Sequence, residues 1–170
     1  MLRPRARFRS FLWEHAPELA KDFNGPLIRF QIIGRHMCGG DLDRLLILGV
    51  IILRANEHPD YAALDPEEVM AGLIDPLPAL PVNTSSIADS TGIPRESVRR
   101  KLSELVKMGW VSRERGAFRF TPVGYREVEP LRQAAIALTV QCTEAVERSL
   151  ALHGMLGHSR RSDQAGELGR

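Results

Sequence analysis

Side chains that can contact nucleic acid gather in one segment of the chain, NTSSIADSTGIPRESVRRKLSELVKMGW, residues 83–110. An arginine can donate two hydrogen bonds to guanine O6 and N7, and a glutamate can accept one from cytosine N4. A helix beginning near residue 94 would expose such side chains at its N-terminal end, namely Arg95, Glu96, Arg99 and Arg100. Ser97 and the free N–H groups of that helix end suit a phosphate. These residue types are typical of a helix that enters the major groove of duplex DNA.

Two helical patterns on either side of a glycine would position these side chains. In the first pattern Ile87 and Ala88 are the inward positions, and Ser85 or Ser86 can cap the helix. Gly92 stands where a tight turn needs a left-handed backbone conformation. The inward stripe of the second helix consists of Val98, Leu102, Leu105 and Val106. A small residue, a glycine and an apolar stripe in this order predict a helix-turn-helix motif.

A β-hairpin is predicted next, because WVSRERGAFRFTP (residues 110–122) forms two short strand patterns around a turn at Arg115–Gly116. Such a hairpin makes the motif a winged helix, and its arginines could reach a flanking minor groove or the phosphate backbone. Lys101 completes a run of three consecutive cations, and its stem can lie along the core with the ammonium group exposed. The DNA-binding residues predicted from the sequence are Ser86, Arg95, Glu96, Ser97, Arg99, Arg100, Lys101, Arg113, Arg115 and Arg119.

The N-terminal half is predicted to be helical as well. An amphipathic helix ends at residues 24–26 (Asn-Gly-Pro), and a second helical stretch follows to about residue 37. The segment LDRLLILGVIILRAN (residues 42–56) is apolar nearly all round, which indicates a buried helix capped by Asp41 or Asp43.

Loops and one long helix are predicted on either side of the hairpin. Five of the chain's 11 prolines lie in residues 57–81, which predicts loops around one short helix near residues 66–73. Thr121 caps a final helix that runs from residue 122 towards residue 153 and is bent or interrupted at Pro130.

The first and last helices offer more apolar surface than one small winged helix can cover, which favours a homodimer. The last helix carries a heptad-like seam at Leu131, Ala135, Leu138, Cys142, Ala145, Ser149 and Leu152. A two-fold dimer would place two recognition helices about 34 Å apart and predicts a palindromic site. The alternative is that this stripe packs on the chain's own helices. The residues predicted for the dimer interface are Phe8, Leu12, Leu19, Leu131, Leu138, Cys142 and Leu152.

Composition and charge narrow the class of protein. A chain of 170 residues that is 44% hydrophobic can bury a sizeable core. Its net charge is only +2, but residues 82–126 hold nine cations against four anions and residues 41–81 hold two against eight. No apolar run approaches the roughly 20 residues of a membrane span. Residues 1–35 form another basic block, with seven cations against three anions. We therefore expect a cytoplasmic protein whose basic residues are placed in blocks, one of which contains residues 83–110.

No motif in the sequence indicates an enzyme, a metal centre or a cofactor. There is no glycine-rich phosphate loop, no Gly-x-Ser-x-Gly elbow and no carboxylate pair in an acid–base motif. His36 and Cys38, with His58 and Asp60 further on, match no metal-ligand spacing. Cys38 and Cys142 are too few for a disulfide scaffold. We expect no catalytic residues, no metal and no cofactor.

The segment PRESVRRKL, residues 94–102, resembles the recognition helix of the cyclic-AMP-receptor/FNR regulators. In that family an Arg-Glu pair and a later arginine read bases, which the resemblance assigns here to Arg95, Glu96 and Arg100. The chain before the motif does not have the strand patterns of that family's cyclic-nucleotide barrel.

The order of elements resembles the MarR family of winged helix-turn-helix transcriptional regulators over roughly residues 41–152. Residues 120–124, Phe-Thr-Pro-Val-Gly, are similar to the "LTP-x-G" start of that family's long C-terminal helix. The chain departs from the family in its proline-rich insertion and in a short wing without the usual Asp-x-Arg pattern. The resemblance implies a dimer built from the N- and C-terminal helices. It also implies a small-molecule pocket of unknown ligand, with Trp13, Phe30, Met37 or Tyr61 as possible lining residues.

These observations predict a mainly α fold, a winged helix-turn-helix with flanking dimerisation helices and a small β-hairpin wing. The predicted divisions are N-terminal helices (1–40), a DNA-binding domain (41–124) with an insertion (57–81), a C-terminal dimerisation helix (125–153) and a flexible tail (154–170). The predicted function is sequence-specific binding of duplex DNA by a homodimeric bacterial transcriptional regulator, with residues 94–108 in the major groove. The alternative is a winged helix that serves as a protein-interaction or architectural module in a larger complex.

Overall fold

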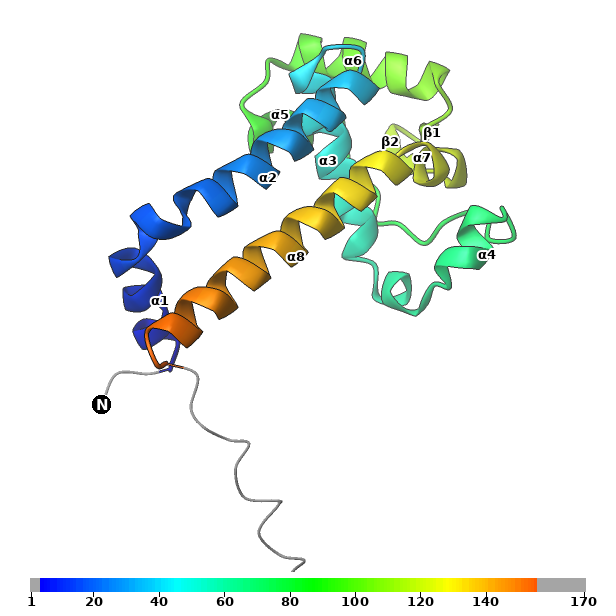
Figure 1. Cartoon of the computed structure of the whole chain (residues 1–170). Helices are drawn as coiled ribbons and strands as arrows, with labels where there is room; N and C mark the ends of the chain where they lie inside the picture. Colours follow the sequence, from blue (N-terminus) through cyan, green and yellow to red (C-terminus); the bar gives the residue numbers. More distant parts are fainter. Residues whose placement is uncertain (1–3, 156–170) are drawn as a thin grey trace, which may run out of the picture. The chain divides into compact units, whose positions relative to one another are not determined.

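The computed structural model describes residues 4–155, which are mainly helical with one small antiparallel sheet (Figure 1). The mainly α prediction is thus confirmed, and the predicted flexible tail lies outside the described residues from residue 156 onwards. The elements in chain order are α1 (Pro4–Glu14), α2 (Ala16–Met37), α3 (Leu42–Asn56), η1 (Pro59–Ala63), α4 (Pro66–Met70), α5 (Thr84–Thr91), α6 (Arg95–Lys107), β1 (Val111–Glu114), β2 (Ala117–Phe120), α7 (Pro122–Glu127) and α8 (Glu129–Leu152). None of the helices within residues 4–155 has the length and apolarity that crossing a membrane requires.

The chain divides into two compact units. The larger unit consists of residues 30–134, and the smaller unit combines, of the residues described, 4–29 with 135–155. Helices α2 and α8 each have one end in either unit, so both units share two of the chain's helices.

Helix α3 lies at the centre of the larger unit. Its residues Ile47, Leu48, Ile51 and Ala55 are fully buried, and α3 contacts α5, α6 and β2. Asp41 caps the helix, since its Oδ1 accepts a hydrogen bond of 3.0 Å from the Arg44 backbone N–H. The predicted cap is confirmed, with Asp41 as the capping residue. The prediction of a buried helix holds for one face only, because Leu42, Leu46 and Leu53 on the other face are 50–55% exposed.

The hairpin forms as the sequence predicts. Strands β1 and β2 pair antiparallel, and Val111 faces Phe120 across the ladder. The two turn residues, Arg115 and Gly116, have positive φ angles of 48° and 83°, as the favoured two-residue hairpin turns require. Val82 extends the pairing through hydrogen bonds of 3.1 and 2.7 Å with the backbone of Phe118, so the hairpin is anchored to the preceding loop.

A hydroxyl cap connects the hairpin to α7. The Thr121 Oγ1 accepts a 3.0 Å hydrogen bond from the Gly124 N–H and donates one of 2.6 Å to the Gly109 carbonyl. The predicted N-cap is confirmed. The helix is interrupted at Val128, just before Pro130, as the proline predicts.

Gly124→Ala destabilises the larger unit by about 1–3 kcal/mol, the usual cost of forcing atoms into a packed site. A Cβ at this position would lie 2.4 Å from the Trp110 carbonyl oxygen, which is backbone and cannot swing away. Urea unfolding of the full chain measures the effect. Gly49→Ala is the matched control, because this helical glycine is exposed and open and alanine is the better helix former by about 1 kcal/mol. Equal stability of the two variants would contradict the close approach at Gly124.

The N-terminal helices differ from the prediction. The sequence places a break at residues 24–26, but α2 is continuous from Ala16 to Met37 and contains Pro26. The interruption lies instead at His15, between α1 and α2. A proline removes its own hydrogen bond and crowds the preceding turn, but its φ is helical, so helical flanking turns can carry the helix through it.

The proline-rich segment forms loops around short helices, as predicted, with η1 in addition to α4. Asp65 caps α4 through a 2.8 Å hydrogen bond from the Glu67 N–H, and α4 ends at Met70, shorter than the predicted helix to residue 73. Further along, Leu77 and Ala79 are buried in the core. The segment thus becomes part of the larger unit.

The smaller unit is built from α1, the first part of α2 and the last part of α8. Phe11, Leu19, Ala145 and Ser149 are buried there. Arg148 lies 3.4 Å from Asp22 in an ion pair between α8 and α2.

Candidate nucleic-acid interface

A tight turn joins α5 to α6. Gly92 has a φ of 72°, and its N–H donates to the Ala88 carbonyl at 2.9 Å. No atom lies within 4 Å of a Cβ built there, so it is the left-handed backbone that requires glycine at this position. The predicted turn is confirmed. The prediction that Ser85 or Ser86 caps α5 is wrong. The cap is Asn83, whose side chain accepts a 2.9 Å hydrogen bond from the Ser86 N–H, and Ser86 itself is exposed.

The buried stripe of α6 fixes which face it exposes. Val98, Leu102 and Leu105 are fully buried, and α6 contacts α3, α5 and β1. Four charged side chains of the N-terminal half point outward from this stripe, namely Arg95, Glu96, Arg99 and Arg100. Pro94 precedes the helix without a side-chain cap, so the first N–H groups of α6 have no side-chain partner.

The exposed arginines of α6 differ in whether another side chain already binds them. Arg99 donates to both carboxylate oxygens of Glu96 at 3.1 and 2.7 Å, and this hydrogen bonding lowers the pKa of Glu96. Arg95 has only a loose ion pair with Asp89, at 3.8 Å. Arg100 forms no ion pair or hydrogen bond within residues 4–155, and its charge only helps to lower the pKa of Glu96. Arg95 and Arg100 are therefore the cations most available to a ligand, and Arg99 would have to exchange its partner.

Lys101 does not lie on the exposed face of α6. It is only 6% exposed, and its ammonium group is paired with Asp41 and lies 3.7 Å from Asp43. Arg44 makes a second bridge from α3 to α6 through its ion pair with Glu104. The expectation that Lys101 presents its ammonium group to DNA is thus not supported by its position, and the residue joins α6 to the N-terminus of α3.

The ionised carboxylate of Asp41 carries part of this link. Burial raises the pKa of Asp41, but hydrogen bonds from Lys101 and the Arg44 backbone, together with the two positive charges, outweigh burial and lower it. A carboxyl with a lowered pKa in the folded state stabilises the fold above its ordinary value of 3.8, and this contribution is lost as the pH falls through the lowered value.

Lys101→Met lowers the free energy of unfolding by about 1–3 kcal/mol at neutral pH, because a hydrogen bond to a charged group is lost while the apolar stem is kept. The difference from the unmodified chain shrinks as the pH falls from 3.8 through the lowered pKa of Asp41, where the folded-state carboxylate becomes protonated. Urea unfolding at several pH values measures both effects. Lys107→Met, an exposed cation on the same helix, is the control and changes stability by less than about 0.5 kcal/mol. A loss that is independent of pH would contradict the ion pair.

The hairpin arginines have three different environments. Arg115 is exposed at the turn, and Arg113 is exposed with its guanidinium 5.7 Å from the centre of the Phe118 ring. Arg119 is directed inward, where it donates to the Ala79 carbonyl at 2.7 Å and lies 3.8 Å from Glu114. Of the three predicted wing contacts, Arg119 is held by a backbone carbonyl, whereas Arg113 and Arg115 have no such hydrogen bond within the described residues.

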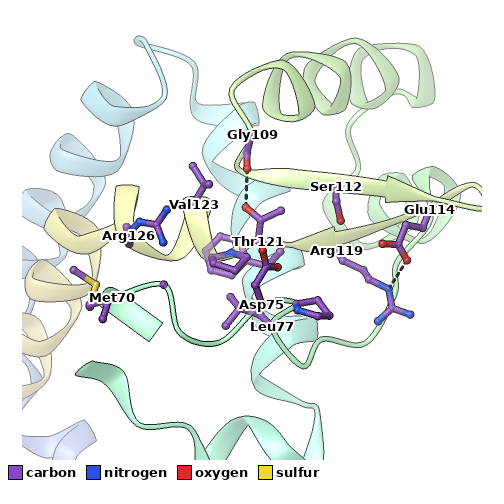
Figure 2. Close-up of a pocket in the computed structure, with 15 residues that line it drawn as sticks. Met70, Asp75, Leu77, Gly109, Ser112, Glu114, Arg119, Thr121, Val123 and Arg126 are labelled. Atoms are coloured by element: carbon purple, nitrogen blue, oxygen red, sulfur yellow. Dashed lines mark hydrogen bonds and ion pairs between the residues drawn. The ribbon is translucent and has the colours of Figure 1, made fainter. Parts of the chain in front are cut away.

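A pocket of about 560 Å³ lies beside the hairpin in the larger unit (Figure 2). The segment after α4 forms one wall, and β2 with the start of α7 forms the other; Figure 2 shows Arg119 and Glu114 paired at its edge. The residues that the MarR resemblance suggested as pocket lining, Trp13, Phe30, Met37 and Tyr61, do not line this pocket. Its volume is in the range of small-molecule sites. Sequence reasoning missed it because the proline-rich segment showed no sign that it packs against α7.

The seam predicted for dimerisation faces inward for the most part. Leu19 and Leu131 are buried within their own units, and Leu12, Leu138 and Cys142 are half-buried, whereas Phe8 and Leu152 are exposed. Further exposed apolar side chains of α2 and α8 lie outside the predicted interface, namely Leu27, Ile28 and Ile32 on α2, and Ile136 and Val140 on α8. The alternative that the seam packs on the chain's own helices fits its burial better.

Arg95, Arg99 and Arg100 on α6 and Arg113 and Arg115 on the hairpin thus lie exposed within one compact unit. A surface of this kind can bind phosphate groups and base edges. Comparison with protein-family models, with curated proteins and with solved structures gave no match for this chain.

Proposed function

We propose that the chain is a sequence-specific, double-stranded DNA-binding transcriptional regulator that acts as a homodimer. In this proposal α5, the turn at Gly92, α6 and the hairpin form a winged helix-turn-helix of the MarR-like kind. The observation that carries the proposal is the exposed N-terminal face of α6, where Arg95 and Arg100 stand opposite a fully buried stripe.

The rigid attachment of α6 would give the base contacts their precision. The stripe at Val98 and Leu102 fixes the rotation of the helix, and the pairs from Lys101 and Arg44 tie it to α3. The N-terminus of α6 then enters the major groove, where Arg95 and Arg100 donate to guanine edges. The uncapped N–H groups before Val98 and the side chain of Ser97 hold a backbone phosphate.

The wing contributes less than the sequence suggests. Arg113 and Arg115 reach the backbone or the minor groove beside the site, while Arg119 holds the hairpin to the proline-rich segment. The proposed contact set therefore consists of Ser86, Arg95, Glu96, Ser97, Arg99, Arg100, Arg113 and Arg115.

A second copy of the chain is the proposed partner of the exposed apolar faces. Ile28 and Ile32 form one i, i+4 pair on α2, and Ile136 and Val140 form another on α8. Side chains of this type that are about half exposed in the single chain gain burial in a dimer. A two-fold dimer presents two copies of α6, which supports recognition of a palindromic site.

The test is retention of a random-sequence duplex DNA pool by the full chain at two salt concentrations. The proposal expects strong retention at low salt that falls at higher salt, because phosphate contacts release counterions. Absence of retention at both salt concentrations would contradict the proposal and favour a protein-interaction module. Retention that is lost in full at moderate salt, with no sequence enriched, would favour an architectural role.

A further inference from the structure

Three side chains far apart in the sequence meet in the smaller unit. His15 lies at the joint between α1 and α2, Glu18 lies in the first turn of α2, and His153 follows α8. The His15 Nδ1 and the His153 Nε2 are each 3.3 Å from the same oxygen of Glu18, Oε2. The two imidazole rings lie side by side, with centres 3.8 Å apart and planes 31° from parallel.

We propose that His15, Glu18 and His153 form a binding site for a divalent transition-metal ion. Bonds of about 2.0–2.2 Å from a tetrahedral ion to nitrogen and oxygen ligands place neighbouring ligand atoms about 3.3–3.5 Å apart. Two of the three ligand pairs already have this spacing, and all three ligand atoms lie within 4.8 Å of one another. The remaining pair consists of the two imidazole nitrogens, and rotation of the exposed His153 side chain can bring it to the same spacing.

The donor set selects the kind of ion. Two imidazole nitrogens and one carboxylate oxygen suit Zn²⁺, Co²⁺, Ni²⁺ and Cu²⁺, whereas Mg²⁺ and Ca²⁺ prefer oxygen ligands throughout. Three protein ligands leave a fourth tetrahedral position for water. The side of the site next to α1 is formed by Phe11, which is buried and whose ring centre lies 4.5 Å from that of His15. Phe11 thereby restricts the orientation of this imidazole.

The bound ion would join the α1–α2 joint to the end of α8. Glu18 and His153 are 135 positions apart, so one ion closes most of the chain into a loop. Such a site is invisible to spacing rules, which detect ligands that are near one another in sequence. Metal binding here does not depend on DNA binding, and it is measured without DNA.

The first experiment is titration of the metal-free full chain with Co²⁺, followed by its visible absorption, with Zn²⁺ as competitor. The expected result is one tetrahedral Co²⁺ per chain, displaced by Zn²⁺. Saturation with Zn²⁺ at about 100 times the dissociation constant raises the melting temperature by about 5–10 °C. Absence of saturable binding, or binding without displacement by Zn²⁺, would overturn the proposal.

Matched variants locate the ion. His15→Asn, His153→Asn and Glu18→Gln each weaken Co²⁺ binding by at least about tenfold. Loss of a residue that merely hydrogen-bonds to a metal ligand already lowers metal affinity by about 10–100-fold. His36→Asn is the control, because this exposed histidine lies in the larger unit, and it leaves binding unchanged. Circular dichroism establishes that each variant is folded. Binding that is equal in all four variants, or that is lost only in His36→Asn, would place the ion elsewhere and refute the site.

Glu18→Gln keeps the proposal testable if a histidine variant is unstable. The amide retains the size of the carboxylate and its capacity to accept hydrogen bonds, but it is a much weaker metal ligand. A folded Glu18→Gln chain that binds Co²⁺ as tightly as the unmodified chain would therefore also refute the site.

Discussion

Arg100→Ala weakens binding of the full chain to duplex DNA carrying its recognition sequence by about 5–150-fold, which corresponds to a loss of about 1–3 kcal/mol. The reason is that Arg100 is exposed on the outer face of α6 and has no partner within the described chain, so its guanidinium is free to pair with guanine. Arg95→Ala has an effect of the same order, because its only ion pair, with Asp89, is long at 3.8 Å. Fluorescence anisotropy with labelled duplex measures both.

A control variant and a comparison of DNA sequences distinguish a base contact from a general effect of charge. Lys107→Ala removes an exposed cation from the C-terminal end of the same helix and leaves affinity nearly unchanged. A base-reading arginine, when lost, relaxes the preference at one base pair, whereas a phosphate-binding arginine weakens all sequences alike. If Arg95→Ala and Arg100→Ala both bind as tightly as the unmodified chain, α6 does not lie in the groove.

If the proposed dimer forms through α8, Ile136→Asp combined with Val140→Asp converts it into a monomer and raises its dissociation constant by at least about 100-fold. Both side chains are about half exposed in the single chain, at 51% and 48%, and lie one helical turn apart on α8. An isolated carboxylate buried in an apolar interface costs several kcal/mol. Sedimentation velocity at micromolar concentration measures the change, and affinity for a palindromic duplex falls with it.

The control for this prediction is Leu73→Asp. Leu73 is an exposed apolar residue in the segment after α4, outside α2 and α8, and its replacement is expected to leave the proposed dimer intact. An unmodified chain that sediments as a monomer would contradict the proposed dimer. A double variant that remains dimeric would place the interface on a different surface.

Features set by local chemistry were predictable from the sequence. The left-handed turn at Gly92, the Thr121 cap and the hairpin turn at Arg115–Gly116 each depend on a few neighbouring residues, and each is found where the sequence indicates. The same holds for the interruption before Pro130 and for the Asp41 cap of α3, whereas α3 itself is buried on one face only.

Features set by contacts across the chain were not predictable in the same way. Lys101 looked like one of three consecutive cations, but two aspartates about 60 positions earlier bind it. Arg119 looked like a wing contact, but the Ala79 carbonyl accepts its hydrogen bond. In both cases the helical or strand position was predicted, and the partner came from a distant segment.

The faces of the long helices show the same limit. A seam with alternating spacings of four and three predicts that one stripe of α8 is used in packing, but it does not tell whether the stripe packs against the same chain or a second one. Ala145 and Ser149 of the seam are buried within the single chain, and the exposed residues Ile136 and Val140 lie beside it. Likewise, nothing in the spacing of His15, Glu18 and His153 indicates that they meet.

The central claim is tested most directly by sequencing the DNA that the full chain retains from a random duplex pool. The proposal predicts enrichment of one palindromic motif, with half-sites whose centres are about one helical turn (34–36 Å) apart and with guanines at the positions that Arg95 and Arg100 contact. A retained pool with no enriched motif, or a single motif without two-fold symmetry, would contradict the claim of a sequence-specific homodimer.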